Sequence, residues 1–427
     1  MMRTCVVGAG ASGLACAEAL SKAGASVKVL EAHSEVGGTW SLSQPDSQLY
    51  DGLRTNLPTR LMAFSDFPFP KGLSSFVGSR DMENYLHAFA AAKGLVQYIR
   101  FNRQVQHIAI MESGKFQVTH KGEEVETETF DAVVVCNGHF NKRLIPGRLA
   151  TDAQKWGGHW VHSKDYRRPQ DYRDQVVVVV GAQSSGTDIA RELDGIASQV
   201  HVCDDDCPKE PRATDREGNL VELEMEGPYC YRIPNTQCVR WRPRLESLEH
   251  GSRVVHFSRG APLEADTVIF CTGYQFDYPF LPPGVPELTA SAKRVRSVYK
   301  DLMHVDYPML FFVGLNQPIV PFPFFEMQAR WVAYMITHRD HVPNLDDRKK
   351  GMLSMDARVA AGELPEASAH VLRDQWEYML DLAREAHLDD YAVLVDRFEE
   401  ARRIYNHVGN IRPPFPAQDD TYRRSLI

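Results

Sequence analysis

Residues 4–13 read Thr4-Cys5-Val6-Val7-Gly8-Ala9-Gly10-Ala11-Ser12-Gly13, and this stretch decides the fold. Its apolar first half predicts a buried strand, and the good helix formers at 14–23 predict a helix directly after the glycines. A second apolar run at 27–30 predicts another strand. Strand, glycine turn, helix and strand in this order indicate a βαβ unit of the kind that binds a dinucleotide.

Each glycine of the turn has a separate expected role. Gly8 permits the tight bend, Gly10 lets the backbone approach a pyrophosphate, and Gly13 lets helix and strand pack closely. The backbone amides at the helix N-terminus, where Ser12 lies, then hold the phosphates. Glu31 ends the second strand, where a carboxylate accepts hydrogen bonds from a ribose diol and opposes a ribose phosphate. The first site is therefore predicted to suit FAD or NAD better than NADP.

A second copy of the pattern starts with five consecutive valines at 176–180 and continues through the glycine-containing turn 181–186 into a helix at 187–193. Two nucleotide sites follow from the two copies. The predicted fold class is α/β, with two dinucleotide-binding (Rossmann-like) domains, the second inserted into the first. The predicted ranges are 1–145 for the first part of the FAD-binding domain, 146–269 for the inserted NAD(P)H-binding domain, and 270–427 for the second part with C-terminal helices.

Composition and charge exclude several classes of partner. The 427 residues carry a formal charge of -8, so no basic surface is predicted for nucleic acid. No apolar run reaches the roughly 18 residues of a membrane span, and the first strand begins too early to leave room for a signal peptide. The eight cysteines favour a reduced, cytoplasmic location. The spacing of Cys203, Cys207, Cys230 and Cys238 matches no common zinc site, so no metal is predicted.

Several stretches together resemble the flavin-containing monooxygenases. Glu31 is followed after five residues by Gly37-Gly38-Thr39-Trp40, and 53–58 (Leu-Arg-Thr-Asn-Leu-Pro) and 62–70 are similar to the stretches around the family's active-site asparagine. Residues 156–166 fit the family's pattern of Phe, Gly, His and Tyr or Phe, with Trp156 in place of Phe. Tyr166 followed by Arg167 argues against the Baeyer–Villiger relatives. Further similarity at 270–282, 320–331 and 375–378 extends the resemblance over most of the chain, toward the soluble GS-OX-like branch.

The resemblance implies an FAD-dependent, NAD(P)H-consuming monooxygenase. It would pass one oxygen atom of dioxygen, through a hydroperoxyflavin, to a small amine, alkaloid or thioether. The cofactor supplies this chemistry, so no catalytic triad is needed. Asn56 is the predicted catalytic residue, through hydrogen bonds to flavin or nicotinamide, with an Asx-turn before Pro58 as the alternative. His162 is expected to fix a loop. The predicted cofactor-binding residues are Gly8, Gly10, Ser12, Gly13, Glu31, Gly38, Thr39, Trp40, Thr55, Asn56, Leu57, Val105, Gly181, Ser184, Ser185, Gly186, Thr187, Asp188 and Gln328.

Two features depart from the family pattern. Gln183 replaces the middle glycine of the second turn, and the strand at 200–203 runs into Asp204-Asp205-Asp206 where a 2′-phosphate would require basic residues. Lys209, Arg212 or Arg216 are candidates to compensate, so NADPH is the first expectation and NADH the alternative.

Other functions stay open at this point. They are a flavin-dependent NAD(P)H oxidase, a Baeyer–Villiger-type monooxygenase and a non-catalytic nucleotide sensor. A disulfide reductase is disfavoured because no Cys-x-x-Cys pair occurs. The substrate and the oligomeric state, including a homodimer, are not determined by the sequence.

Overall fold

The computed structural model describes residues 1–44, 47–214 and 220–411, and these form two compact units. Unit 1 contains 1–44, 55–142 and 275–405, and unit 2 contains 47–54, 143–214, 220–274 and 406–411. The predicted domain ranges 1–145, 146–269 and 270–427 stay a prediction. Sequence reasoning did not anticipate that the short segment 47–54, just before Asn56, groups with unit 2.

Unit 1 is built on a seven-stranded sheet in the order β22-β23-β24-β7-β1-β2-β3. Its strands are β1 (Arg3–Val7), β2 (Ser26–Leu30), β3 (Ile99–Arg100), β7 (Ala132–Val135), β22 (Val298–Tyr299), β23 (Met303–His304) and β24 (Leu310–Phe312). Strands β24, β7, β1, β2 and β3 run parallel. Parallel sheets are covered on both faces, which explains the continuous apolar runs that predict these strands.

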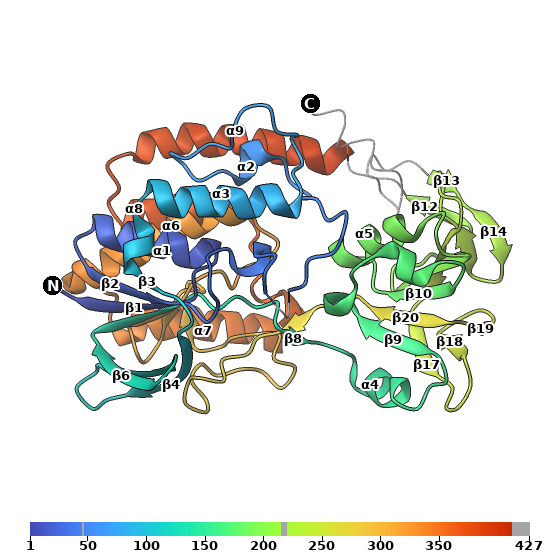
Figure 1. Ribbon diagram of the computed structural model, residues 1–427, viewed down its shortest axis with the longest axis horizontal. Helices are drawn as coiled ribbons and strands as arrows, with labels where there is room; N and C mark the ends of the chain where they lie inside the picture. Colours follow the sequence, from blue (N-terminus) through green and yellow to red (C-terminus); the bar gives the residue numbers. More distant parts are fainter. Residues whose placement is uncertain (45–46, 215–219, 412–427) are drawn as a thin grey trace. The chain divides into compact units, whose positions relative to one another are not determined.

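Helices and a smaller sheet cover this sheet. Figure 1 draws α1 (Ala11–Lys22), α3 (Ser79–Ala92) and α6 (Pro321–Thr337) on one side and the antiparallel strands β4–β6 on the other. The bounds of these strands are β4 (Gln104–Ile110), β5 (Phe116–Lys121) and β6 (Val125–Phe130). The other helices of the unit are α2 (Thr59–Met62), α7 (Leu345–Ala360), α8 (Gln375–Glu385) and most of α9 (Tyr391–Ile411).

Unit 2 repeats the design, with a seven-stranded sheet in the order β14-β15-β16-β11-β10-β20-β9. The parallel strands are β16 (Val239–Pro243), β11 (Gln199–Asp204), β10 (Val176–Val180), β20 (Thr267–Phe270) and β9 (His159–His162). The antiparallel edge consists of β14 (Glu224–Gly227) and β15 (Cys230–Arg232).

The valines of β10 alternate between two separate cores. Val177 and Val179 pack with residues of α5 (Ser184–Leu193), whereas Val178 and Val180 pack with residues of α4 (Gly147–Ala153) and β17 (Leu245–Leu248). Figure 1 draws α5 and α4 on opposite sides of the sheet of unit 2. Because both faces of β10 are buried, neither face requires polar residues, which explains the five consecutive valines.

The remaining elements are short. The strands are β12 (Arg212–Thr214), β13 (Leu220–Glu222), β17 (Leu245–Leu248), β18 (Val254–Phe257), β19 (Leu263–Glu264), and β8 (Lys142–Arg143) paired with β21 (Tyr274–Gln275). The 3-10 turns are Gly38–Trp40, Leu95–Tyr98, Ser163–Asp165, Pro169–Tyr172, Arg339–His341 and Glu366–Ser368. The two parallel sheets with their helices confirm the predicted α/β class. None of the described helices is long and apolar enough to cross a membrane.

Candidate active site

The first glycine turn joins β1 to α1, and its shape depends on missing side chains. Gly8 has φ +102, and a Cβ there would lie 2.6 Å from the carbonyl oxygen of Cys136. A Cβ on Gly13 would lie 2.0 Å from the carbonyl oxygen of Gly8. No L side chain fits either position without movement of the backbone. The tight turn leads directly into the N-terminus of α1, where backbone amides have no helical partner, the geometry that binds phosphate.

Gly10 has a different role from its neighbours. Its φ of -73 is ordinary, but it lies against Gly38, because a Cβ on Gly38 would be 2.8 Å from the Gly10 Cα. Gly10 also forms an isolated bridge with Gly37. The Gly-Gly-Thr-Trp stretch thus borders the turn, with Thr39 exposed and Trp40 half-buried against the core of unit 1.

Glu31 is bound to the turn itself. Its side chain is buried, Oε2 accepts a 2.6 Å hydrogen bond from the Ala9 amide, and Oε1 accepts one of 2.9 Å from the His33 amide. The His33 Nδ1 lies 3.0 Å from the same Oε1. A carboxylate has about four acceptor positions, so capacity for a ribose hydroxyl remains. The sequence predicts only a ribose contact for Glu31. It does not predict that Glu31 also holds the glycine turn through the Ala9 amide.

The second turn in unit 2 reproduces the first. Gly181 also has φ +102, and a Cβ there would lie 2.7 Å from the Cys271 carbonyl oxygen. A Cβ on Gly186 would lie 1.8 Å from the carbonyl oxygen of Gly181. Gln183 takes the place of Gly10 with φ -80, so its side chain causes no backbone strain. The turn therefore keeps its geometry despite the missing glycine.

The predicted residues around this second turn divide into two groups. Ser184 and Ser185 are exposed at the start of α5. The Thr187 hydroxyl donates to the Gln183 carbonyl at 3.1 Å, and Asp188 pairs with Arg191 at 2.7 Å. Thr187 and Asp188 therefore contact their own helix, whereas the two serines are open to a ligand.

The predicted residues 55–57 follow the segment that belongs to unit 2. Thr55 is buried and its amide donates to the Val77 carbonyl at 2.9 Å, while its hydroxyl has no partner among the described residues. Leu57 is half-buried. Asn56 is exposed, and no side-chain hydrogen bond joins it to another described residue. The Asx-turn alternative for Asn56 is not seen.

Gln328 lies deep in unit 1 and is fully buried. Its Oε1 accepts from the Gly314 amide at 3.0 Å, and its Nε2 donates to Asn316 Oδ1 at 3.1 Å and to the Tyr378 hydroxyl at 3.2 Å. The network continues through Asp301, which binds Asn316 at 2.6 Å. Every polar atom of Gln328 thus has a protein partner. Val105 on β4 is likewise buried in the core of unit 1.

The acidic end of β11 is partly neutralised by the fold. Asp204 Oδ1 accepts from Trp241 Nε1 at 2.9 Å and from the Asp206 amide at 3.1 Å, and burial raises the pKa of Asp204. Asp205 is exposed, with Arg244 at 3.5 Å. Arg212 contacts Glu222 at 4.0 Å. Arg216 lies outside the described residues.

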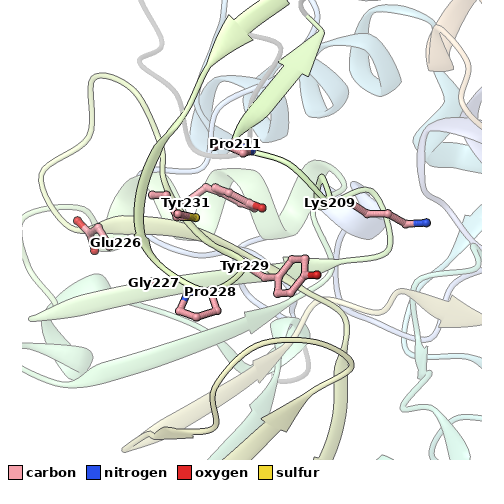
Figure 2. Close-up of a pocket in the computed structure, with 8 residues that line it drawn as sticks. Lys209, Pro211, Glu226, Gly227, Pro228, Tyr229 and Tyr231 are labelled. Atoms are coloured by element: carbon pink, nitrogen blue, oxygen red, sulfur yellow. The ribbon is translucent and has the colours of Figure 1, made fainter.

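A pocket of about 440 Å³ lies near this strand end. Its lining, drawn as sticks in Figure 2, is Lys209, Pro211, Met225, Glu226, Gly227, Pro228, Tyr229 and Tyr231. Tyr231 pairs with Trp241 on β16, which runs parallel to β11. The β14–β15 turn therefore lies at the carboxyl ends of the parallel strands, the edge where open α/β sheets bind ligands.

His162, Tyr166 and Trp156, from the 156–166 pattern, are buried or hydrogen-bonded to other residues of unit 2. His162 Nδ1 accepts from the Lys164 amide at 3.1 Å and its Nε2 lies 3.0 Å from the Gly273 carbonyl, where it donates. Burial lowers the pKa of His162 to about 4, so the ring is neutral. Tyr166 and Trp156 are buried, and the Tyr166 hydroxyl donates to Glu192 at 3.0 Å. His162 fixes a loop, as the sequence predicts.

The sequence profile of the family described as Flavin-binding monooxygenase-like matches residues 1–207 and 234–387. Flavin-containing monooxygenase FMO GS-OX-like 2 of Arabidopsis thaliana is 34% identical over 98% of this chain and 90% of its own length. FMO GS-OX4 of the same plant is 31% identical over 98% and 90%.

Solved structures agree with this result. The S-allyl-L-cysteine S-oxygenase of Allium sativum is 26% identical with a TM-score of 0.80, covering 100% of this chain and 97% of that chain. The cyclohexanone monooxygenase of Rhodococcus sp. Phi1, bound to NADP+, shares the fold, with 14% identity and a TM-score of 0.61 over 91% and 98%.

Proposed function

The chain belongs to the flavin-binding monooxygenase-like family, and from this premise we propose that it oxygenates the sulfur of a small thioether, with FAD and NADPH as cofactors. The full-length similarity to an S-oxygenase at 26% identity carries the choice of sulfur. Amines and alkaloids, which are also soft nucleophiles, form the second substrate class. Bound flavin would supply the activation of dioxygen, and the residues of this chain would position the reactants.

The residues of unit 1 fit FAD. The Gly8–Gly13 turn leads into the N-terminus of α1, whose backbone amides would bind a pyrophosphate, and Gly10 has no side chain that would hinder its approach. Glu31 retains acceptor capacity for a ribose hydroxyl. Trp40 and Thr39 border the same turn. Asn56 is exposed, so its amide is available for a hydrogen bond to flavin or nicotinamide. Gln328 would act by fixing Gly314 and Asn316, since its polar atoms already have protein partners.

The residues of unit 2 support a nicotinamide nucleotide at the second turn. Ser184 and Ser185 are exposed where α5 begins, and the Gly181–Gly186 geometry matches that of the first turn. Lys209 lines the pocket close to the end of β11 and forms no ion pair within the described part of the chain. We assign Lys209 to a 2′-phosphate, which favours NADPH, with NADH as the alternative. Lys209→Met is expected to raise KM for NADPH about tenfold while KM for NADH stays unchanged.

Turnover stoichiometry tests the proposal. Purified protein with a panel of small thioethers should consume NADPH and dioxygen and form sulfoxide in equal amounts. Hydrogen peroxide formed in place of sulfoxide with every thioether and amine would show an oxidase instead. Lactone or ester formation from ketones would show a Baeyer–Villiger enzyme. A preference for NADH of more than about tenfold, roughly 1.4 kcal/mol, would refute the NADPH assignment.

We also propose a cytoplasmic location. All eight cysteines are free and buried, which suits a reducing compartment. Cell fractionation tests this, and recovery from membranes alone would contradict it.

A further inference from the structure

Away from the glycine turns, three side chains of unit 1 converge. One carboxylate oxygen each of Glu35 and Glu83 and one ring nitrogen of His87 lie within 4.8 Å of one another. Glu83 and His87 are four residues apart on α3 and so share one face of the helix. Glu35 comes from the segment that follows β2, and its Oε2 lies 3.8 Å from His87 Nε2.

Hydrogen bonds from neighbouring residues hold both carboxylates in place. The Ser41 hydroxyl donates to Glu35 Oε1 at 2.7 Å, and the Ser43 hydroxyl donates to the same oxygen. The Leu42 amide donates to Glu83 Oε1 at 2.7 Å. The bond from Ser43, followed by that from Ser41, lowers the pKa of Glu35, so this carboxylate is ionised at neutral pH. Carboxylates that bind metals are oriented by outer hydrogen bonds of this kind.

His87 provides an independent observation. Its Nε2 is buried from solvent and has no hydrogen-bond partner among the described residues, although its side chain as a whole is 42% exposed. A buried polar atom without a partner is unfavourable, because it has lost its hydrogen bond to water. The unpartnered nitrogen faces Glu35, so a cation between the two would satisfy both groups.

A second group of the same composition provides a contrast. His120, Glu126 and Glu128 also converge, but Lys28 lies 2.7 Å from Glu128 and Arg103 lies 3.5 Å from Glu126. Lysine and arginine thus already neutralise that group. Within the described residues neither Glu35 nor Glu83 has an ion pair with lysine or arginine, which leaves two negative charges beside one imidazole.

We propose that Glu35, Glu83 and His87 bind a divalent transition-metal ion of the Zn²⁺ class. One imidazole nitrogen and two carboxylate oxygens are ligands that Zn²⁺ accepts at about 2.0–2.2 Å, with a water as the fourth ligand. Ligand atoms around such an ion are about 3.4 Å apart, close to the 3.8 Å between Glu35 and His87. The site departs from the expectation of no metal, which rested on cysteine spacing alone.

The ion would have a structural effect. It would join the segment 35–43 to α3, and this segment contains Gly38, which lies against Gly10 in the first turn. Zinc is therefore expected to stabilise the border of that turn. The inference does not depend on the proposed substrate or cofactors, and its test measures binding rather than turnover.

The test is a titration of the full-length, chelator-treated protein with ZnCl2, followed by calorimetry and by competition with a zinc-binding dye. One site per chain and a rise in melting temperature with zinc are expected. His87→Gln and Glu83→Gln should each weaken binding at least tenfold and remove the zinc-dependent rise. Glu126→Gln, in the lysine- and arginine-paired group, is the matched control and should bind as the parent does.

Several results would overturn the proposal. These are the absence of saturable binding, unchanged affinity in both His87→Gln and Glu83→Gln, or loss of binding in His341→Gln. The last outcome would place the ion at the exposed histidines 338, 341 and 387 around Tyr334. Glu83→Gln keeps an amide oxygen for the Leu42 amide, so it is expected to fold. Circular dichroism of each variant separates lost binding from lost structure.

Discussion

Replacement of Gly186 by alanine tests whether the second turn is the nicotinamide site. The added Cβ would lie 1.8 Å from the carbonyl oxygen and 2.9 Å from the carbonyl carbon of Gly181. Ordinary contacts need more than 3 Å, so the turn and α5 must separate by about 1 Å or more. Overpacking costs about 1–3 kcal/mol where side chains can adjust. Both neighbours here are backbone, so we expect about 3 kcal/mol.

The same displacement moves the amides of α5 away from a bound phosphate. The loss of one charge-assisted hydrogen bond costs about 1.5–3 kcal/mol, which corresponds to a KM for NADPH about 10- to 150-fold higher. Steady-state kinetics and flavin content measure the effect, and flavin should be retained because Gly186 lies outside unit 1. Gly147→Ala is the matched control, since a Cβ there meets no atom within 4 Å. An unchanged KM in Gly186→Ala, or loss of flavin with normal KM, would refute the reasoning.

Three further substitutions have defined outcomes. Glu31→Gln places an NH2 group against the amide of Ala9 or of His33, so we expect flavin loss on gel filtration and about 2 kcal/mol lower stability. Full flavin retention would contradict this. Burial raises the pKa of Glu192 from 4.5 to about 7. Between pH 4.5 and 7 the folded protein therefore keeps a proton on Glu192 that the unfolded chain has lost. The free energy of unfolding consequently falls as the pH rises through this range. Glu192→Gln should therefore raise the melting temperature at pH 8 more than at pH 5, and an equal shift at both would count against the assignment. Gln183 has φ -80, so Gln183→Gly relieves no backbone strain. The KM for NADPH should stay equal or fall, and the stability should fall by up to about 1 kcal/mol. A higher KM would show that the Gln183 side chain itself binds the nucleotide.

The sequence by itself determined the two turns. Glycines at fixed spacing between an apolar strand and a helix predict one backbone geometry, because only a missing Cβ permits the approach of Gly13 to Gly8 and of Gly186 to Gly181. The α/β class followed from the same local pattern. The sequence also predicted that His162 fixes a loop. Its Nδ1 partner, the Lys164 amide, is local, but the Gly273 carbonyl that accepts from Nε2 is 111 residues away and is brought there by the fold.

Only the tertiary structure decided which distant residues share a contact. Gln328 meets Asn316 and Tyr378, and Glu35 meets Glu83 and His87, across loops and helices whose packing no local pattern encodes. Glu31 shows both sources of information together: its place at a strand end predicted a ribose ligand, but its bond to the Ala9 amide appeared only with the fold. Backbone geometry is set by neighbours in the chain, whereas the partners of a side chain are set by how sheets and helices pack.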